Sequence, residues 1–141
     1  MSASFFISKG LMSAGFLNFS AREAYLEANS NAFILDVRES NLIGYKKFAV
    51  KNIFYIPLSE LKSRIDEIPV DKGIIVADSV GLRSKEAILI LNNLGFTNIA
   101  NLAGGLVDWE RDGVPLIINN LERLDGSCAC QLKPRYKQKN K

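Results

Sequence analysis

The chain has 141 residues, 48% of them hydrophobic, which suits one domain with a sizeable core. It contains no histidine, which excludes histidine-containing metal sites and the usual general base. The formal net charge of +3 comes from the C-terminal end, where the last eleven residues carry five basic and no acidic side chains. This pattern favours a solvated tail over contact with an acidic membrane, and we expect no nucleic-acid partner.

Residues 1–18 read as an apolar N-terminal extension whose one charged side chain is Lys9. Lys9 and Gly10 interrupt the apolar residues, so the stretch does not resemble a secretory signal, and it is too short and mixed to span a bilayer. We expect it to pack on the domain, with contact to a membrane surface or a partner as the alternative. Because no targeting signal is readable, the expected location is the cytoplasm.

A helix is predicted directly after this extension. Ser20 can cap it, Glu23 can return the capping bond, and Phe19 can pack against Ala24. The helix is expected to end near Asn29. The domain itself is expected to span residues 19–118.

Four short runs rich in apolar and β-branched residues predict buried strands. These runs are 32–37, 53–56, 74–77 and 98–102. Helices are predicted between them by apolar residues at helical spacing and by capping signals. The first is 58–68, with Ser59 as N-cap. The second has Ala87, Ile88, Leu91 and Leu94 on one apolar stripe, and Gly95 ends this helix. The third is 106–111, with Trp109 in the core. This alternation predicts an α/β fold, with a mostly parallel central sheet and helices on both faces.

The strand at 74–77 leads through a short loop into the helix that Gly95 ends. The loop and the helix start consist of Asp78, Ser79, Val80, Gly81, Leu82, Arg83 and Ser84. A tight glycine-containing loop at a helix N-terminus makes an anion site, because free backbone N–H groups converge there and the helix dipole adds positive charge. We therefore predict an anion-binding loop at residues 78–84. A nucleophile would stand on its first residue, which is Asp78.

This strand, loop and helix resemble the active loop of the rhodanese-like domain, a sulfurtransferase family. The family's loop starts with a cysteine at the end of a buried strand and ends with Arg-Ser five and six residues later. The matching positions here are Asp78, Arg83 and Ser84. The resemblance implies a single rhodanese-like domain.

Two other segments carry the same resemblance, which runs from about Phe19 to Leu116. Residues 34–38 resemble the family's first core strand with its Asp-x-Arg, and residues 101–109 resemble its Gly-Gly and Trp segment. Residues 48–53 depart from the Gly-His-Ile-Pro-Gly-Ala of many members. We expect Asp36 and Arg38 to bond neighbouring loops, and residues 39–50 to be a loop with a helical turn that carries Lys46 and Lys47 near the site.

The aspartate at the nucleophile position changes the chemistry that the resemblance implies. Sulfur transfer needs a thiolate that carries the sulfur as a persulfide, which a carboxylate cannot do. We expect the Asp78 carboxylate to occupy the anion position, accepting loop N–H bonds and pairing with Arg83. The first hypothesis is a non-catalytic module that binds a protein or a small sulfur-containing anion. Phosphoryl transfer through Asp78 is disfavoured, since such sites add Mg²⁺ and further acids, and only Asp36 is expected nearby.

Residues 119–141 form a tail with the chain's two cysteines, Cys128 and Cys130. They can be idle thiols, a mobile sulfur or redox carrier, or ligands of Cu(I) or zinc shared with a second chain. The second hypothesis is a sulfurtransferase or persulfide carrier that uses one of these thiols. A tail extended at ~3.3 Å per residue can reach the loop, and Lys133 and Arg135 would promote thiolate formation. We assign no cofactor and no metal site.

Overall fold

The computed structural model describes residues 10–13 and 15–119. In these ranges a main sheet has the strand order β1-β2-β7-β6-β3-β5. The strands are β1 (Leu11–Ser13), β2 (Phe16–Phe19), β7 (Ile99–Leu102), β6 (Gly73–Ala77), β3 (Ala32–Asp36) and β5 (Ile53–Tyr55). All neighbours pair in parallel except β1, which runs antiparallel to β2 at the edge of the sheet. The predicted mostly parallel sheet is therefore confirmed.

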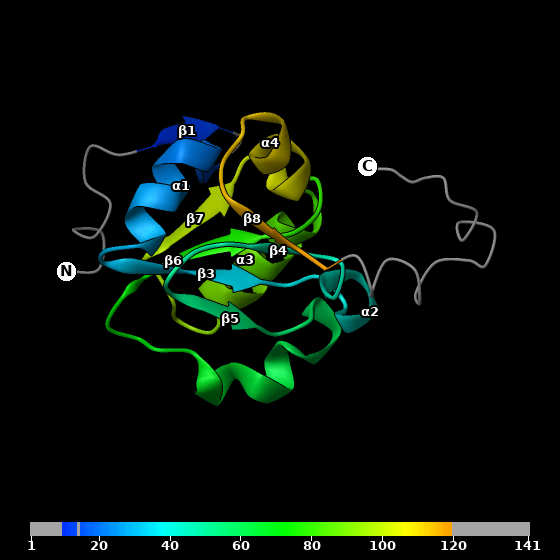
Figure 1. Cartoon of the computed structure of the whole chain (residues 1–141). Helices are drawn as coiled ribbons and strands as arrows, with labels where there is room; N and C mark the ends of the chain where they lie inside the picture. The colour runs from blue at the N-terminus through cyan, green and yellow to red at the C-terminus, as the bar shows by residue number, and fades with distance from the viewer. Residues whose placement is uncertain (1–9, 14, 120–141) are drawn as a thin grey trace, which may run out of the picture.

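Helices cover both faces of the sheet, as predicted (Figure 1). On one face, α1 (Ala21–Ala28) and α4 (Gly105–Arg111) bury Ala24 and Trp109 in one hydrophobic cluster. On the other face, α3 (Arg83–Asn93) packs its buried residues against a second cluster. The central strands β3 and β6 are buried along their whole length, because both of their faces are covered.

The predicted caps account for the ends of two helices. Ser20 and Glu23 form a complete capping box at the start of α1, and Asn29 is its C-cap. After α3, Gly95 has a φ of +97°, a conformation that suits glycine at a helix end. Leu94 does not complete the apolar stripe of α3: the helix ends at Asn93, and Leu94 is its C-cap and is 50% exposed.

The N-terminal strand pair extends the sheet beyond the predicted start of the domain. Strand β2 pairs with β7, and Phe19 at its end is fully buried. The expected boundary at residue 18 therefore lies inside β2. Strands β1 and β2 add to the edge of the main sheet, which the sequence pattern did not predict.

The helix predicted at residues 58–68 is wrong in type. The segment forms two short 3₁₀ helices, η2 (Leu58–Glu60) and η3 (Lys62–Glu67), with a non-helical backbone at Arg64. Ser59 is not an N-cap; its hydroxyl and its N–H both donate to the Glu39 carboxylate. The apolar spacing placed Leu61, Ile65 and Ile68 on one face. Leu61 and Ile68 are buried in the core, and Ile65 is half-buried.

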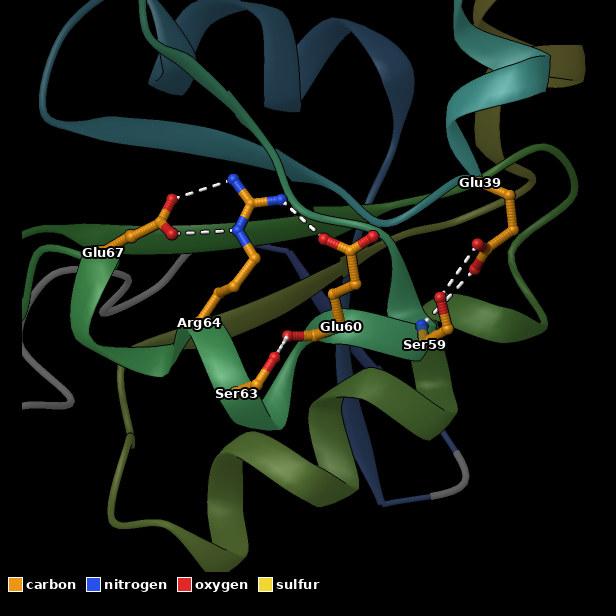
Figure 2. Close-up of polar contacts among 6 residues, drawn as sticks. All are labelled: Glu39, Ser59, Glu60, Ser63, Arg64 and Glu67. Atoms are coloured by element: carbon orange, nitrogen blue, oxygen red, sulfur yellow. Dashed lines mark hydrogen bonds and ion pairs between the residues drawn. The ribbon is translucent and has the colours of Figure 1, made fainter.

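Charged side chains hold the kinked 3₁₀ segment (Figure 2). The Arg64 guanidinium donates to the carboxylates of both Glu60 and Glu67, at 2.9–3.0 Å. These contacts raise the pKa of Arg64 and lower that of Glu67. Because the pairs lie at the surface, they fix the local geometry more than they stabilise the fold.

Residues 39–50, predicted as a loop with a helical turn, contain such a turn and also a strand that was not predicted. A short helix, α2 (Ser40–Ile43), is followed by strand β4 (Lys46–Phe48). Strand β4 pairs antiparallel with β8 (Leu116–Ile118), and the two form a separate small sheet. The pairing joins segments about 70 residues apart, which no local signal in either segment predicts.

Candidate functional site

Asp78 lies directly after β6, and its carboxylate faces the start of α3. Its side chain is 2% exposed. One carboxylate oxygen accepts the backbone N–H of Gly81, and the other accepts the N–H of Arg83 at 2.7 Å. Arg83 is the first residue of α3, so the negative charge lies where the helix dipole is positive. The carboxylate thus bonds two of the N–H groups that converge in the predicted anion site.

The expected ion pair between Asp78 and the Arg83 side chain is absent from the described residues. Arg83 contributes its backbone N–H, while its side chain is exposed and joins no ion pair there. The physical reason is geometric: the short Asp78 side chain lies beneath the loop, and the first turn of α3 directs the longer Arg83 side chain outward.

The first turn of α4 braces the loop backbone from the other side. The N–H groups of Leu106 and Val107 donate to the carbonyls of Asp78 and Ser79, at 2.9 and 3.0 Å. Gly105 makes this docking possible, since an added Cβ atom would lie 2.5 Å from the Asp78 carbonyl oxygen. The free N–H groups of α4 are thereby used on loop carbonyls, which holds the loop in one conformation.

A buried polar chain lies beneath the helix end of the loop. The Ser84 hydroxyl donates to the Asn101 side-chain oxygen, and the Asn101 amide donates to the Asn18 side-chain oxygen at 2.8 Å. Ser84 and Asn101 are almost fully buried. Sequence analysis predicted Ser84 as part of the loop but missed Asn18 and Asn101. The available signal was an asparagine inside the apolar run 99–102, since asparagine is depleted in strands.

Asp36 and Arg38 form a buried ion pair beside the loop, and Arg38 also bonds the neighbouring segment 39–50, as the sequence predicted. The Arg38 guanidinium donates to both Asp36 oxygens and also to the carbonyls of Leu42 and Lys46. Desolvation by burial raises the pKa of the Asp36 carboxyl; the bonds and charge of Arg38 oppose this rise, and the charge of Asp78 adds to it. Arg38 therefore ties the end of β3 to α2 and β4, which is a structural role.

The outer surface of the loop is apolar with one cation. Val80 is 51% exposed and Leu82 is 69% exposed, and Arg83, the next residue along the chain, is exposed as well. Val107, which follows on the neighbouring first turn of α4, is 55% exposed. We call Val80, Leu82, Arg83 and Val107 the loop surface.

Of the other predicted site residues, the two lysines lie in the part of the chain that the structure describes and the two cysteines do not. Lys46 does not face the loop as a free cation, because its ammonium lies 2.6 Å from the Glu110 carboxylate. Lys47 lies in β4 opposite Ile117. Cys128 and Cys130 lie outside the described residues.

Residues 10–13 and 15–119 contain no group of three Cys, Asp or Glu side chains placed to hold a metal ion. No helix in these ranges has the length and apolar character that crossing a bilayer requires. What the described site offers is a rigid loop, a buried carboxylate at a helix N-terminus and a small apolar surface.

Comparison with known proteins places this arrangement in a family. Residues 20–112 match the Rhodanese-like domain. A rhodanese-related protein from Thermoplasma volcanium superposes with a TM-score of 0.65 at 30% identity, covering 72% of this chain and 98% of that one. The chain belongs to the rhodanese-like domain family.

Curated relatives include proteins named for sulfur transfer. Thiosulfate sulfurtransferase GlpE of Actinobacillus pleuropneumoniae serotype 7 is 26% identical over 106 residues, which is 74% of this chain and 96% of that protein. A sulfurtransferase of Allochromatium vinosum is 29% identical over 68 residues, or 48% of this chain. That match spans 64% of the Allochromatium protein, so part of its length has no counterpart in the match.

Proposed function

We propose that the chain is a non-catalytic rhodanese-like module in which Asp78 stands at the position of the family's cysteine and the loop surface binds a partner protein. The observation that supports this proposal is the buried Asp78 carboxylate, whose two oxygens accept N–H bonds from Gly81 and Arg83. A carboxylate oxygen cannot accept a sulfane sulfur as a persulfide, so the loop has no nucleophile suited to sulfur transfer.

A small sulfur-containing anion is the weaker candidate for the ligand. It would have to approach a loop that already contains a negative charge, and two of the N–H groups it needs are bonded to Asp78. The charge of Asp78 opposes such an anion in a partly desolvated site, where interactions between charges are strong. Asp78 thus acts as a built-in ligand.

The loop surface suits contact with a protein. Val80, Leu82 and Val107 expose apolar side chains, and Arg83 supplies a cation that can bond a carboxylate of the partner. The loop backbone is already held by Asp78 and by the first turn of α4. Binding would therefore order little more of the loop, which lowers the entropic cost of association.

The first test restores a thiol at residue 78. In a background with Cys128→Ser and Cys130→Ser, we expect Asp78→Cys to give a thiol whose pKa is below the ordinary value of about 8.5, because the same N–H groups and helix dipole would face it. The pKa is measured from the pH dependence of alkylation by iodoacetamide. A thiol with an ordinary pKa would contradict the proposed anion position.

The second test vacates the anion position. Asp78→Ala should allow thiosulfate to shift the amide NMR signals of Gly81 and Arg83, whereas the unmodified chain should show no such shifts at the same concentration. Asp71→Ala is the matched control, since it removes an exposed aspartate that precedes the other end of β6. Equal shifts in the unmodified chain and in Asp78→Ala would mean that Asp78 does not fill the site.

A second candidate function is sulfur transfer by a tail thiol. It is favoured by where the described chain ends: the Asn119 N–H donates to the Tyr45 carbonyl, next to the Lys46 carbonyl that Arg38 bonds. Asn119, the last described residue before Cys128 and Cys130, therefore lies on the side of the fold where β3 ends.

Thiosulfate and persulfide transfer by the unmodified chain and by the Cys128→Ser, Cys130→Ser variant separate the two candidates. No transfer by the unmodified chain eliminates the tail thiols for that donor. Transfer that survives the loss of both thiols contradicts both candidates.

A further inference from the structure

An asparagine in the centre of the main sheet contacts both the loop end and the N-terminal strands. Asn101, in β7, is 1% exposed. Its side-chain oxygen accepts the hydroxyl of Ser84, the second residue of α3, and its amide donates to Asn18 in β2. The Asn18 amide in turn donates to the Phe16 carbonyl at 3.0 Å. One hydrogen-bonded chain therefore runs from β2 to the first turn of α3.

A buried amide tolerates displacement less well than an apolar side chain does. Leucine and isoleucine side chains can slide past one another with a small change in energy, whereas a buried donor or acceptor that loses its partner carries the full cost of its desolvation. The Asn101 oxygen accepts and its amide donates, so the residue fits one relative placement of β2, β7 and α3. A satisfied network of this kind specifies a single arrangement.

We infer that Asn101 is a positioning residue for the candidate site. Through Ser84 it fixes the first turn of α3, and therefore the placement of the Arg83 N–H against the Asp78 carboxylate. Through Asn18 it makes this placement depend on β2. The inference rests on the proposed function in one respect, since it takes the loop at residues 78–84 as the site.

Positioning by Asn101 gives a role to a strand outside the family match. The match begins at residue 20, whereas Asn18 lies in β2 and its strand pairs with β7. The strand pair β1–β2 is then part of the support of the loop as well as an edge of the sheet.

The direct test measures amide hydrogen exchange in the full chain with Asp78 in place. Asn101→Leu has a similar shape and removes both side-chain bonds. We expect exchange at the Gly81 and Arg83 amides to become at least about tenfold faster, with a smaller change at the Val76 amide in the centre of the sheet. A uniform change at all three amides, or no change at the loop, would overturn the inference.

The matched control is another asparagine that bridges two elements far from the loop. The Asn52 amide donates to the carbonyls of Ala28 and Ala32, at the end of α1 and the start of β3. Asn52→Leu should destabilise the chain without selective exchange at Gly81 and Arg83. The same selective loop effect from Asn52→Leu would show that any loss of stability opens the loop, which contradicts positioning by Asn101.

A second variant covers the case in which Asn101→Leu does not fold. Asn18→Leu lies at a half-buried position and leaves the contact between Ser84 and Asn101 in place, but it removes the acceptor of the Asn101 amide. It should speed exchange at the same two loop amides, by a smaller factor. Unchanged exchange at both amides would mean that β2 has no part in placing the loop.

A readout on the introduced thiol separates failure of this inference from failure of the proposed function. With Asp78→Cys in the background without tail cysteines, Asn101→Leu should raise the thiol pKa toward about 8.5. A thiol pKa that is low with or without Asn101→Leu contradicts the positioning role alone. A thiol pKa that is ordinary before Asn101 is changed contradicts the proposed anion position, while the exchange experiment still decides the role of Asn101.

Discussion

At the scale of single residues, burial decides what each charged group in this protein can do. Asp36, Arg38 and Asp78 are all buried, yet each has its polar atoms bonded. Buried charges are tolerated only when they are paired or hydrogen-bonded. The pair of Asp36 and Arg38 therefore connects elements, whereas Asp78 is bonded by the loop's own backbone.

The buried pair gives a prediction on stability. Asp36→Asn should lower the free energy of unfolding by about 3–5 kcal/mol, because it leaves the Arg38 guanidinium buried without a countercharge. The double substitution Asp36→Leu, Arg38→Met removes both charges and should cost less than Asp36→Asn alone. Urea denaturation of the three chains measures the difference. A double variant less stable than Asp36→Asn would mean that the pair contributes net stability.

Tyr55 gives a prediction on pH dependence. Desolvation raises the pKa of its phenol above the ordinary 10.0, and the charge of Asp36 adds to the rise. The folded state thus holds this proton more tightly than the unfolded state does. The contribution to stability is complete below pH 10 and is lost as the pH rises through the folded pKa.

Spectrophotometric titration of the chain's four tyrosines checks the Tyr55 prediction. The titration curve should contain a component that ionises above the ordinary phenol pKa of 10.0, and Tyr55→Phe should remove that component. Tyr45→Phe is the comparison. If Tyr45→Phe removed the high-pH component instead, the raised pKa would belong to Tyr45 and the prediction for Tyr55 would be wrong.

At the scale of elements, the site is made by two helix starts that meet one loop. The first turn of α3 provides an N–H for Asp78, and the first turn of α4 provides N–H groups for the loop carbonyls. Each helix uses backbone donors that have no partner within the helix. The loop is therefore held in place by hydrogen bonds between its own polar groups and the N–H groups at the two helix starts.

A substitution at Gly105 should disrupt the contact between α4 and the loop. Its φ is +58°, and an added Cβ would lie within 2.5–2.7 Å of the backbone of Asp78 and Ser79. Gly105→Ala should destabilise the chain by more than Gly95→Ala, which meets no atom within 4 Å and should cost about 1–2 kcal/mol for its left-handed backbone. Urea denaturation of both variants is the measurement. Equal losses would mean that α4 can move off the loop at no cost.

At the scale of the whole molecule, the sheet needs the N-terminal strand pair. Removing residues 1–19 would uncover the edge of β7 and delete Phe19, whose loss from the core alone is worth about 3–5 kcal/mol. We expect the truncated chain to have a lower melting temperature and to self-associate through the uncovered edge. Size-exclusion chromatography and thermal denaturation check both effects.

The control for this truncation changes the same strand pair without removing it. Leu11 and Met12 are 72% and 65% exposed, so Leu11→Ser with Met12→Ser should leave the melting temperature nearly unchanged. A truncated chain with the same melting temperature as the full chain would refute the structural role of β1 and β2.

The elements that sequence analysis predicted correctly have local causes. The capping box of α1, the glycine that ends α3 and the apolar runs of β3 and β6 each depend on residues a few positions apart. The loop at residues 78–84 was recognisable for the same reason, since strand, glycine and helix start follow one another directly.

Most features that were missed or wrong have causes that lie far apart along the chain. Strand β4 exists through its pairing with β8, and the 3₁₀ form of residues 58–67 goes with contacts that include Glu39. The Arg83 side chain is an exception: it was expected on Asp78, only five residues away, but the carboxylate bonds the Arg83 backbone instead.

The amino-acid sequence by itself determined the alternation of strands and helices, the position of the loop and the aspartate at its start, because these follow from hydrophobic spacing and local capping. Only the tertiary structure decided which donors reach Asp78, which helix braces the loop, and that Asn18 and Asn101 lie beneath it. The contacts of α4, Asn18 and Asn101 form when distant segments pack together, and no short window of sequence contains both partners. The donors to Asp78 lie only three and five residues away, but which of them reach its carboxylate depends on the conformation of the folded loop.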